Sequence, residues 1–102
     1  MLRIRRINNR AAPIAICDHC GRLIDDSATA WYEWLESGPG PVTGEIYFLH
    51  KACVDAFEAA RPEGPGQMWA NGELTVFPYY LGGNLRVDWD AARELADFSS
   101  RL

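Results

Sequence analysis

All three cysteines of the chain and one of its two histidines fall into two short pairs. Cys17 and Cys20 are separated by two residues, and so are His50 and Cys53. Two cysteines at this spacing on a tight turn bring their sulfurs to one point, and Gly21 follows where the backbone must fold round them. Side chains three residues apart at the start of a helix share a face. The spacing therefore predicts that a hairpin between the pairs brings four donor atoms together.

Three thiolates and one imidazole form a donor set typical of structural zinc. We expect one Zn²⁺ bound by Cys17, Cys20, His50 and Cys53, with a helix N-terminus helping to keep Cys53 a thiolate. Because four protein ligands fill a tetrahedral shell, no position stays open for a reactive water. Iron in a rubredoxin-like site also fits the softness and geometry of these ligands, although the imidazole favours zinc. We expect His19, inside the turn, to be an exposed bystander.

Two other interpretations of the cysteines stay open. A redox Cys-x-x-Cys pair normally opens a helix in a βαβ unit, whereas this pair is followed by Gly21 and a strand-like sequence. Free cysteines also pack simply as small apolar side chains. Three cysteines cannot all pair with one another, which argues against a secreted scaffold stapled by disulfides.

The length of 102 residues fits a single domain, and the hydrophobic (48%) and charged (24%) fractions are those of a globular protein. No apolar stretch is long enough to span a membrane. The basic N-terminus lacks the hydrophobic region of a secretory signal, because Pro13 interrupts a short one. We therefore expect a small cytoplasmic protein that does not associate with membranes.

The net charge of −4 is unevenly distributed. The first ten residues carry +4 and no acid, from Arg3, Arg5, Arg6 and Arg10, so the remaining residues carry −8. An acidic body repels a phosphate backbone, which leaves this basic arm as the one candidate for binding nucleic acid. The simpler interpretation is a strand that buries Leu2, Ile4 and Ile7 on one face while its arginines point to water.

Hydrophobic patterning predicts an α+β fold. We expect strands at 2–7, 28–35 and 45–49, a connector at 8–13, a loop at 37–41, and helices at 50–60 and 88–102. The segment 73–83 fits a strand or a helix, and we favour a helix in which Thr75 is the N-cap, Pro78 lies in the first turn and Gly82 or Gly83 is the C-cap. The pair Asn71-Gly72 is typical of a tight turn.

The helices at 50–60 and 88–102 are both expected to be amphipathic. In the first, the residues at helical spacing are apolar, namely Cys53, Ala56, Phe57 and Ala60. In the second, Asp88 is a good N-cap and one face is apolar, consisting of Ala91, Leu95, Phe98 and Leu102.

The sequences CDHCG at 17–21 and HKAC at 50–53 resemble a treble-clef zinc finger, in which a zinc knuckle, a β-hairpin and a helix supply the ligands in that order. The ligand order also resembles the first half of a LIM domain, although the second ligand set is absent and the spacer is longer. The whole pattern is similar to small uncharacterised bacterial proteins with a CxxCG…HKxC site. The resemblance covers roughly residues 14–60. We expect a basic N-terminal strand or arm at 1–13, a treble-clef-like zinc-binding module at 14–61 and a mainly helical extension at 62–102 that packs on it.

A treble clef implies a metal and a topology rather than an activity. We expect the protein not to be an enzyme, because its carboxylate pairs have structural explanations. Asp25-Asp26 is typical of a turn, and Asp88/Asp90 is typical of a helix cap. The abundance of aromatic residues predicts a non-catalytic protein–protein interaction module, with Trp69 and Tyr79 as a candidate exposed patch for a partner protein or a second copy. The alternative is a nucleic-acid-binding regulatory protein that uses the arginine arm.

Overall fold

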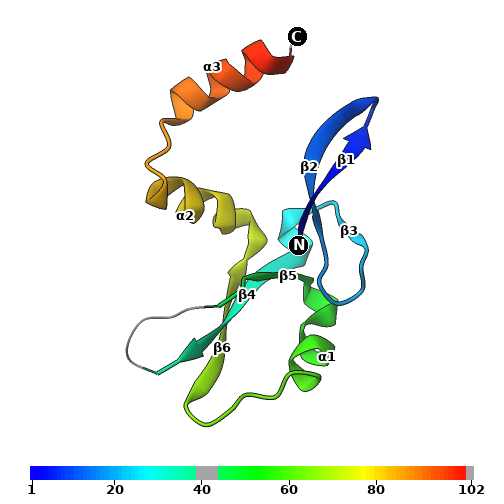
Figure 1. Ribbon diagram of the computed structural model, residues 1–102, viewed down its shortest axis with the longest axis vertical. Coiled ribbons are helices and arrows are strands. Elements are labelled where there is room, and N and C mark those ends of the chain that lie inside the picture. The colour runs from blue at the N-terminus through cyan, green and yellow to red at the C-terminus, as the bar shows by residue number, and fades with distance from the viewer. Residues whose placement is uncertain (39–43, 101–102) are drawn as a thin grey trace.

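Two small antiparallel sheets and three α-helices make up the computed structural model, which describes residues 1–38 and 44–100 (Figure 1). The first sheet has the order β1-β2-β3, with β1 at Leu2–Ile7, β2 at Arg10–Ile16 and β3 at Leu23–Ile24. The second has the order β5-β4-β6, with β4 at Ala30–Ser37, β5 at Tyr47–His50 and β6 at Gln67–Glu73. The helices are α1 at Val54–Ala59, α2 at Phe77–Asn84 and α3 at Trp89–Ser100. The structure is thus the predicted α+β type.

The predicted connector at 8–13 is wrong, since most of it belongs to β2. Asn8 and Asn9 form a two-residue turn with φ of 49° and 66°, and Ile7 pairs with Arg10 across it. Asparagine tolerates this left-handed backbone better than most residues, and two such residues in succession are typical of a tight hairpin. The N-terminal segment is therefore a β-hairpin, β1–β2, and not a single strand with a loose tail.

Burial of the apolar residues of β1 was also predicted wrongly. Leu2, Ile4 and Ile7 are 61%, 69% and 44% exposed. The hairpin extends away from the second sheet (Figure 1), and every residue of β1 is exposed. An exposed two-stranded ribbon with three large aliphatic side chains is left without a core of its own.

The core of the protein lies around the sheet β5-β4-β6 and is aromatic on both faces. Tyr47 and Phe48 are successive in β5, so their side chains point to opposite faces. Phe57 of α1 packs on Tyr47 and Phe77 of α2 packs on Phe48, with ring centroids 5.0 Å apart in each pair. The helices α1 and α2 therefore contact opposite faces of one sheet.

The predicted turn at Asn71-Gly72 is wrong, because both residues lie inside β6. Gly72 pairs with Tyr32 of β4, and a Cβ atom on Gly72 would lie 2.8 Å from the Tyr32 ring. The glycine is needed here for close approach of a large neighbour rather than for a turn. Pairing of β6 with β4 also places a strand in the segment 62–102, which was expected to be mainly helical.

The predicted helix at 50–60 is shorter and more exposed than expected. His50 is the last residue of β5, Lys51–Cys53 form one 3₁₀ turn, and α1 follows. Phe57 is fully buried, but Ala56 and Ala60 are exposed. A six-residue helix reaches the core with one large side chain, so the small alanines do not contribute to its buried face.

The favoured helix at 73–83 is confirmed as a 3₁₀ turn at Leu74–Val76 followed by α2, with Pro78 in the first turn. Its predicted caps are wrong. The N-cap is Val76 rather than Thr75, and the helix continues through Gly82 and Gly83 to end at Asn84. The left-handed residue beyond it is Arg86, with φ of 54°.

The last helix is confirmed, and its N-cap is Asp88, whose Oδ1 accepts a hydrogen bond of 3.1 Å from the Ala91 N–H. Its apolar face is uncovered, since Leu95 is 67% and Phe98 62% exposed. Leu102 lies outside the described residues, and so do residues 39–41 of the predicted loop at 37–41. Ser37 of that loop belongs to β4. Among the described residues, no helix has the length and apolar character to cross a membrane.

The corner between α2 and α3 gives a testable prediction. A Cβ atom on Gly82 would lie 2.3 Å from the Trp89 ring, whereas one on Gly83 would meet nothing within 4 Å. Gly82→Ala should therefore destabilise the protein by about 1–3 kcal/mol through overpacking. The matched control Gly83→Ala should stabilise it by about 0.4–1 kcal/mol, because alanine restricts the unfolded chain. Urea unfolding of both variants measures the difference, and equal midpoints would contradict the packing of Trp89 on α2.

Candidate metal centre

The first ligand pair lies on a tight turn directly after β2. The Gly21 N–H donates to the Cys17 carbonyl at 3.0 Å, and the Cys17 N–H donates to the Arg22 carbonyl at 2.9 Å. Gly21 has φ of 73°, a conformation in which a side chain would be strained. These bonds fold the backbone back on itself, so that the sulfurs of Cys17 and Cys20 face the same space.

Asp18 holds this turn against the second sheet. Its N–H donates to the Phe48 carbonyl at 2.8 Å, and its Oδ2 accepts from the Phe48 N–H at 2.8 Å. This role of Asp18 was not predicted, although a short carboxylate side chain between two cysteines is suited to accepting hydrogen bonds from nearby backbone. These two hydrogen bonds join the cysteine turn to β5 at Phe48, two residues before His50.

The second ligand pair comes from the end of β5 and the turn after it. The 3₁₀ turn at Lys51–Cys53 brings Cys53 back to the level of His50. The donor atoms of Cys17, Cys20, His50 and Cys53 all lie within 4.8 Å of one another, as the spacing predicted. His50 Nδ1 lies 3.3 Å from Cys20 Sγ. In a tetrahedral zinc site this edge would be about 3.6 Å, so the donor set fits one ion.

The electrostatics of Cys17 favour a thiolate. Burial raises the pKa of its thiol, but backbone N–H groups aimed at the sulfur bring that pKa down to about 6. They belong to Cys20, His50 and His19, and the His50 N–H lies 3.4 Å from the sulfur. Cys17 is fully buried, so a charge on its sulfur is stabilised by backbone rather than by water.

Cys53 behaves differently from the prediction. Burial raises the pKa of its thiol to about 11, with a further contribution from the negative charge of Cys17. The positive end of the short helix α1 does not overcome these two effects. Three thiolates in so small a space repel one another, and a divalent cation is the group that would remove this repulsion.

Two further polar side chains near the cluster, those of His19 and Lys51, do not belong to it. His19 is exposed and lies outside the cluster, in agreement with its predicted role as a bystander. Lys51 is held on the other side of the turn, with its Nζ 5.0 Å from the centre of the Trp31 ring and 3.8 Å from a carboxylate oxygen of Glu73. Cys20 is exposed, which places the cluster at the protein surface.

The other predicted site residues do not join this cluster. Trp69 packs its ring on Phe57 with centroids 5.6 Å apart, whereas Tyr79 is 70% exposed on α2. They belong to opposite faces of the second sheet and form no common patch. The basic residues Arg3, Arg5, Arg6 and Arg10 are exposed on the β1–β2 hairpin.

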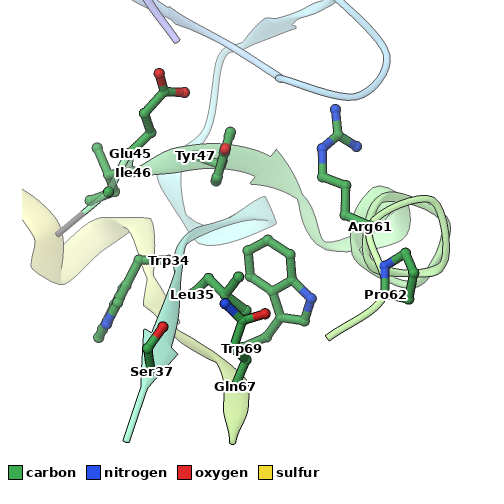
Figure 2. A pocket seen from close by; sticks show the side chains of 11 residues that line it. Trp34, Leu35, Ser37, Glu45, Ile46, Tyr47, Arg61, Pro62, Gln67 and Trp69 are labelled. Carbon is green, nitrogen blue, oxygen red and sulfur yellow. The ribbon is translucent and has the colours of Figure 1, made fainter. Parts of the chain in front are cut away.

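A pocket of about 450 Å³ lies beside α1 and is walled by Trp34, Tyr47 and Trp69 (Figure 2). Arg61 and Glu45 stand at different sides of it. None of the four clustered ligands lines this pocket. The cluster and the concave surface are therefore separate features.

A buried carboxyl group on β4 was not recognised from the sequence. Glu33 is fully buried, and neither of its carboxylate oxygens has a hydrogen-bond partner of good geometry. Burial and, to a lesser extent, the Glu58 carboxyl together raise its pKa to about 8, while the Asn71 side chain opposes the rise. The only signal in the sequence is an acid placed among aromatic residues in AWYEWL at 30–35.

The fold and the cluster define a small α+β protein with four residues arranged as a possible site for one metal ion. No protein-family model matches the chain, and none of the curated proteins or solved structures compared with it is significantly similar to it. Functional interpretation therefore depends on the chemistry of the site.

Proposed function

We propose that the chain is a structural zinc-binding protein that acts as a small, non-catalytic interaction module. The observation that carries this proposal is the convergence of three sulfurs and one imidazole nitrogen within 4.8 Å. Soft sulfur ligands with one imidazole favour zinc over magnesium or calcium. Four protein ligands complete the tetrahedral shell, so the ion would support the fold and would not activate water.

The order of elements supports the finer proposal of a treble-clef arrangement. A cysteine turn is followed by the antiparallel pair β4–β5 and then by α1. Two ligands come from that turn, His50 is the last residue of β5, and Cys53 is the N-cap of α1. The third strand, β6, pairs with the far edge of β4 and extends this arrangement. In this proposal the ion links the turn to the start of α1.

The exposed apolar surface supports the interaction role. Among the described residues, large hydrophobic side chains that are more than half exposed occur on the hairpin, on β6 and on or next to the C-terminal helices: Leu2, Ile4, Met68, Tyr79, Tyr80, Leu85, Trp89, Leu95 and Phe98. Large exposed apolar patches are typical of sites that contact another macromolecule. Nucleic-acid binding is the second candidate, supported by the four exposed arginines of the hairpin.

Native mass spectrometry of the purified chain, together with elemental analysis, tests the proposal. We expect one zinc ion per chain and no metal-dependent hydrolysis of general esterase, phosphatase or nuclease substrates. A folded chain free of any bound ion would refute the metal site. A salt-dependent complex with duplex DNA or RNA at micromolar protein would replace the interaction module by the nucleic-acid candidate.

A further inference from the structure

The chain has more surface than a protein of its size normally keeps. Its accessible surface is 7673 Å², about 1,900 Å² more than the scaling law for folded monomers gives for 11.4 kDa. Its radius of gyration is 16.0 Å, against about 13 Å for a domain of this length. A standard protein interface buries about 800 Å² on each partner, so the excess is ample for a stable contact.

Part of this surface is an apolar groove on the first sheet. A pocket of about 310 Å³ opens between that sheet and the start of α2, lined by side chains that include Leu2, Ala15, Phe48 and Phe77. An apolar face of the hairpin adjoins this pocket at Leu2 and Ala15, because Leu2 and Ile4 share one face of β1 and Pro13 and Ala15 of β2 lie opposite them. The pocket and this face together are called the groove. Among these hairpin residues Leu2, Ile4 and Pro13 are exposed.

The second part is the apolar face of α3, formed by Ala91, Leu95 and Phe98. Leu95 and Phe98 are more than 60% exposed. A helix of 12 residues is marginal in water without a packed face, so α3 needs a surface to cover it.

The chain's own groove is not placed to provide this surface. The Trp89 ring fills the space over Gly82, and the Val87 N–H donates to the Gly82 carbonyl at 2.8 Å. These contacts fix the corner at which α3 leaves α2, and α3 stands apart from both sheets in Figure 1. The tip of the β1–β2 hairpin and α3 nevertheless lie toward the same end of the long axis in Figure 1, so one two-fold axis can bring two copies together there.

Charge complementarity also favours a second copy of the chain as the partner of α3. Asp90 and Glu94 flank the apolar face of α3 along one side, given 100° of rotation per residue. Arg6 projects from the same face of β1 as Leu2 and Ile4. An acidic helix thus faces a basic, apolar hairpin when two copies meet, whereas two hairpins or two α3 helices would repel each other.

We propose that two copies of this chain form a reciprocal dimer in which the apolar face of α3 of each copy packs on the β1–β2 groove of the other. This rests on the proposed function, since it names the partner of the interaction module. Each dimer contains the contact twice, so a substitution in either surface acts on both copies.

Sedimentation and light scattering of the zinc-loaded chain, from about 1 to about 100 µM, test the dimer. We expect a reversible shift from one chain mass to twice that mass. Leu95→Asp/Phe98→Asp should weaken dimerisation at least about a hundredfold, because two large apolar side chains lose their burial. The matched control Arg93→Gln, on the opposite side of α3, should dimerise as the wild type does.

A complementation experiment tests the reciprocal geometry. Ile4→Asp disrupts the groove and leaves α3 intact, so this variant alone should also be monomeric. Mixed with Leu95→Asp/Phe98→Asp, it should form a heterodimer held by the one intact contact. Zinc content and far-ultraviolet circular dichroism equal to those of the wild type establish that each variant is folded.

Three results would overturn the dimer. They are a wild-type chain that stays monomeric over the whole concentration range, α3 variants that dimerise normally, and a mixture that stays monomeric. A monomeric chain with one zinc ion that captures another protein through α3 would overturn the dimer and leave the proposed function standing. A folded wild-type chain that binds no zinc would instead refute the proposed function itself.

Discussion

Replacing Cys20 by serine should abolish metal binding and leave the chain unfolded or aggregated. Cys20 is exposed and fills no space in the core, so its loss creates no cavity. Any large effect on stability must then come through the ion. Structural zinc contributes about 10–16 kcal/mol of apparent binding free energy in small finger peptides, which is comparable to the whole stability of a domain.

The matched control is His19→Ala, which lies in the same turn and is equally exposed. It should keep one zinc ion per chain and the wild-type midpoint of urea unfolding. Cys17→Ser is less informative, because Cys17 is fully buried and its replacement also disturbs packing. A Cys20→Ser protein with normal zinc content, or one that folds equally well without zinc, would refute the ligand assignment.

Raising the pH from about 5 to 8 should lower the contribution of Glu33 to stability. Its pKa rises from 4.5 to about 8 in the folded protein, so the folded state retains a proton that the unfolded state has lost over this interval. When the native state binds more protons, the free energy of unfolding falls as pH rises. The decrease approaches about 1.4 kcal/mol per pH unit within the window and stops above the folded pKa.

Glu33→Gln keeps the shape of the side chain and removes its titration. At pH 8 this variant should be more stable than the wild type by an amount on the order of 3 kcal/mol, whereas near pH 4.5 the two should be similar. Urea unfolding at several pH values in excess zinc measures the difference, and changes in metal affinity cancel between the two proteins. Asp55→Asn, on the exposed side of α1, should follow the wild-type profile.

Parallel pH profiles for the wild type and Glu33→Gln would show that Glu33 is ionised or hydrated in the folded protein. A smaller shift is expected for Glu58→Gln, since burial, the largest cause of the raised pKa, remains when the neighbouring acid is removed.

The ligand cluster could be predicted because its signal is local. Two pairs at fixed spacing, with Gly21 beside the first pair, determine which side chains converge once a hairpin joins them. The C-terminal helices were predicted at 73–83 and 88–102 and lie at 77–84 and 89–100, and the signals from Pro78 and Asp88 that supported them are also local. Local chemistry of this kind is the same in any fold.

The errors arose where a distant partner decides the structure. Gly72 is typical of a turn in isolation, but the Tyr32 ring across β4 requires a glycine inside a strand. Leu2 and Ile4 follow a buried pattern, yet both side chains are more than 60% exposed in the described part of the chain. The raised pKa of Glu33 comes mainly from burial and in part from Glu58, 25 residues away and on another element, and no pattern in the sequence joins the two.

The division of the four ligands between two sheets has a consequence for inheritance. Cys17 and Cys20 follow the last residue of β2 in the first sheet, while His50 ends β5 in the second and Cys53 closes the turn after it. Neither half carries a complete coordination shell, so a gene fragment encoding one sheet alone could not be recombined into a new host and keep its ion. Homologues that descend from this chain should therefore keep all four ligands or lose all four.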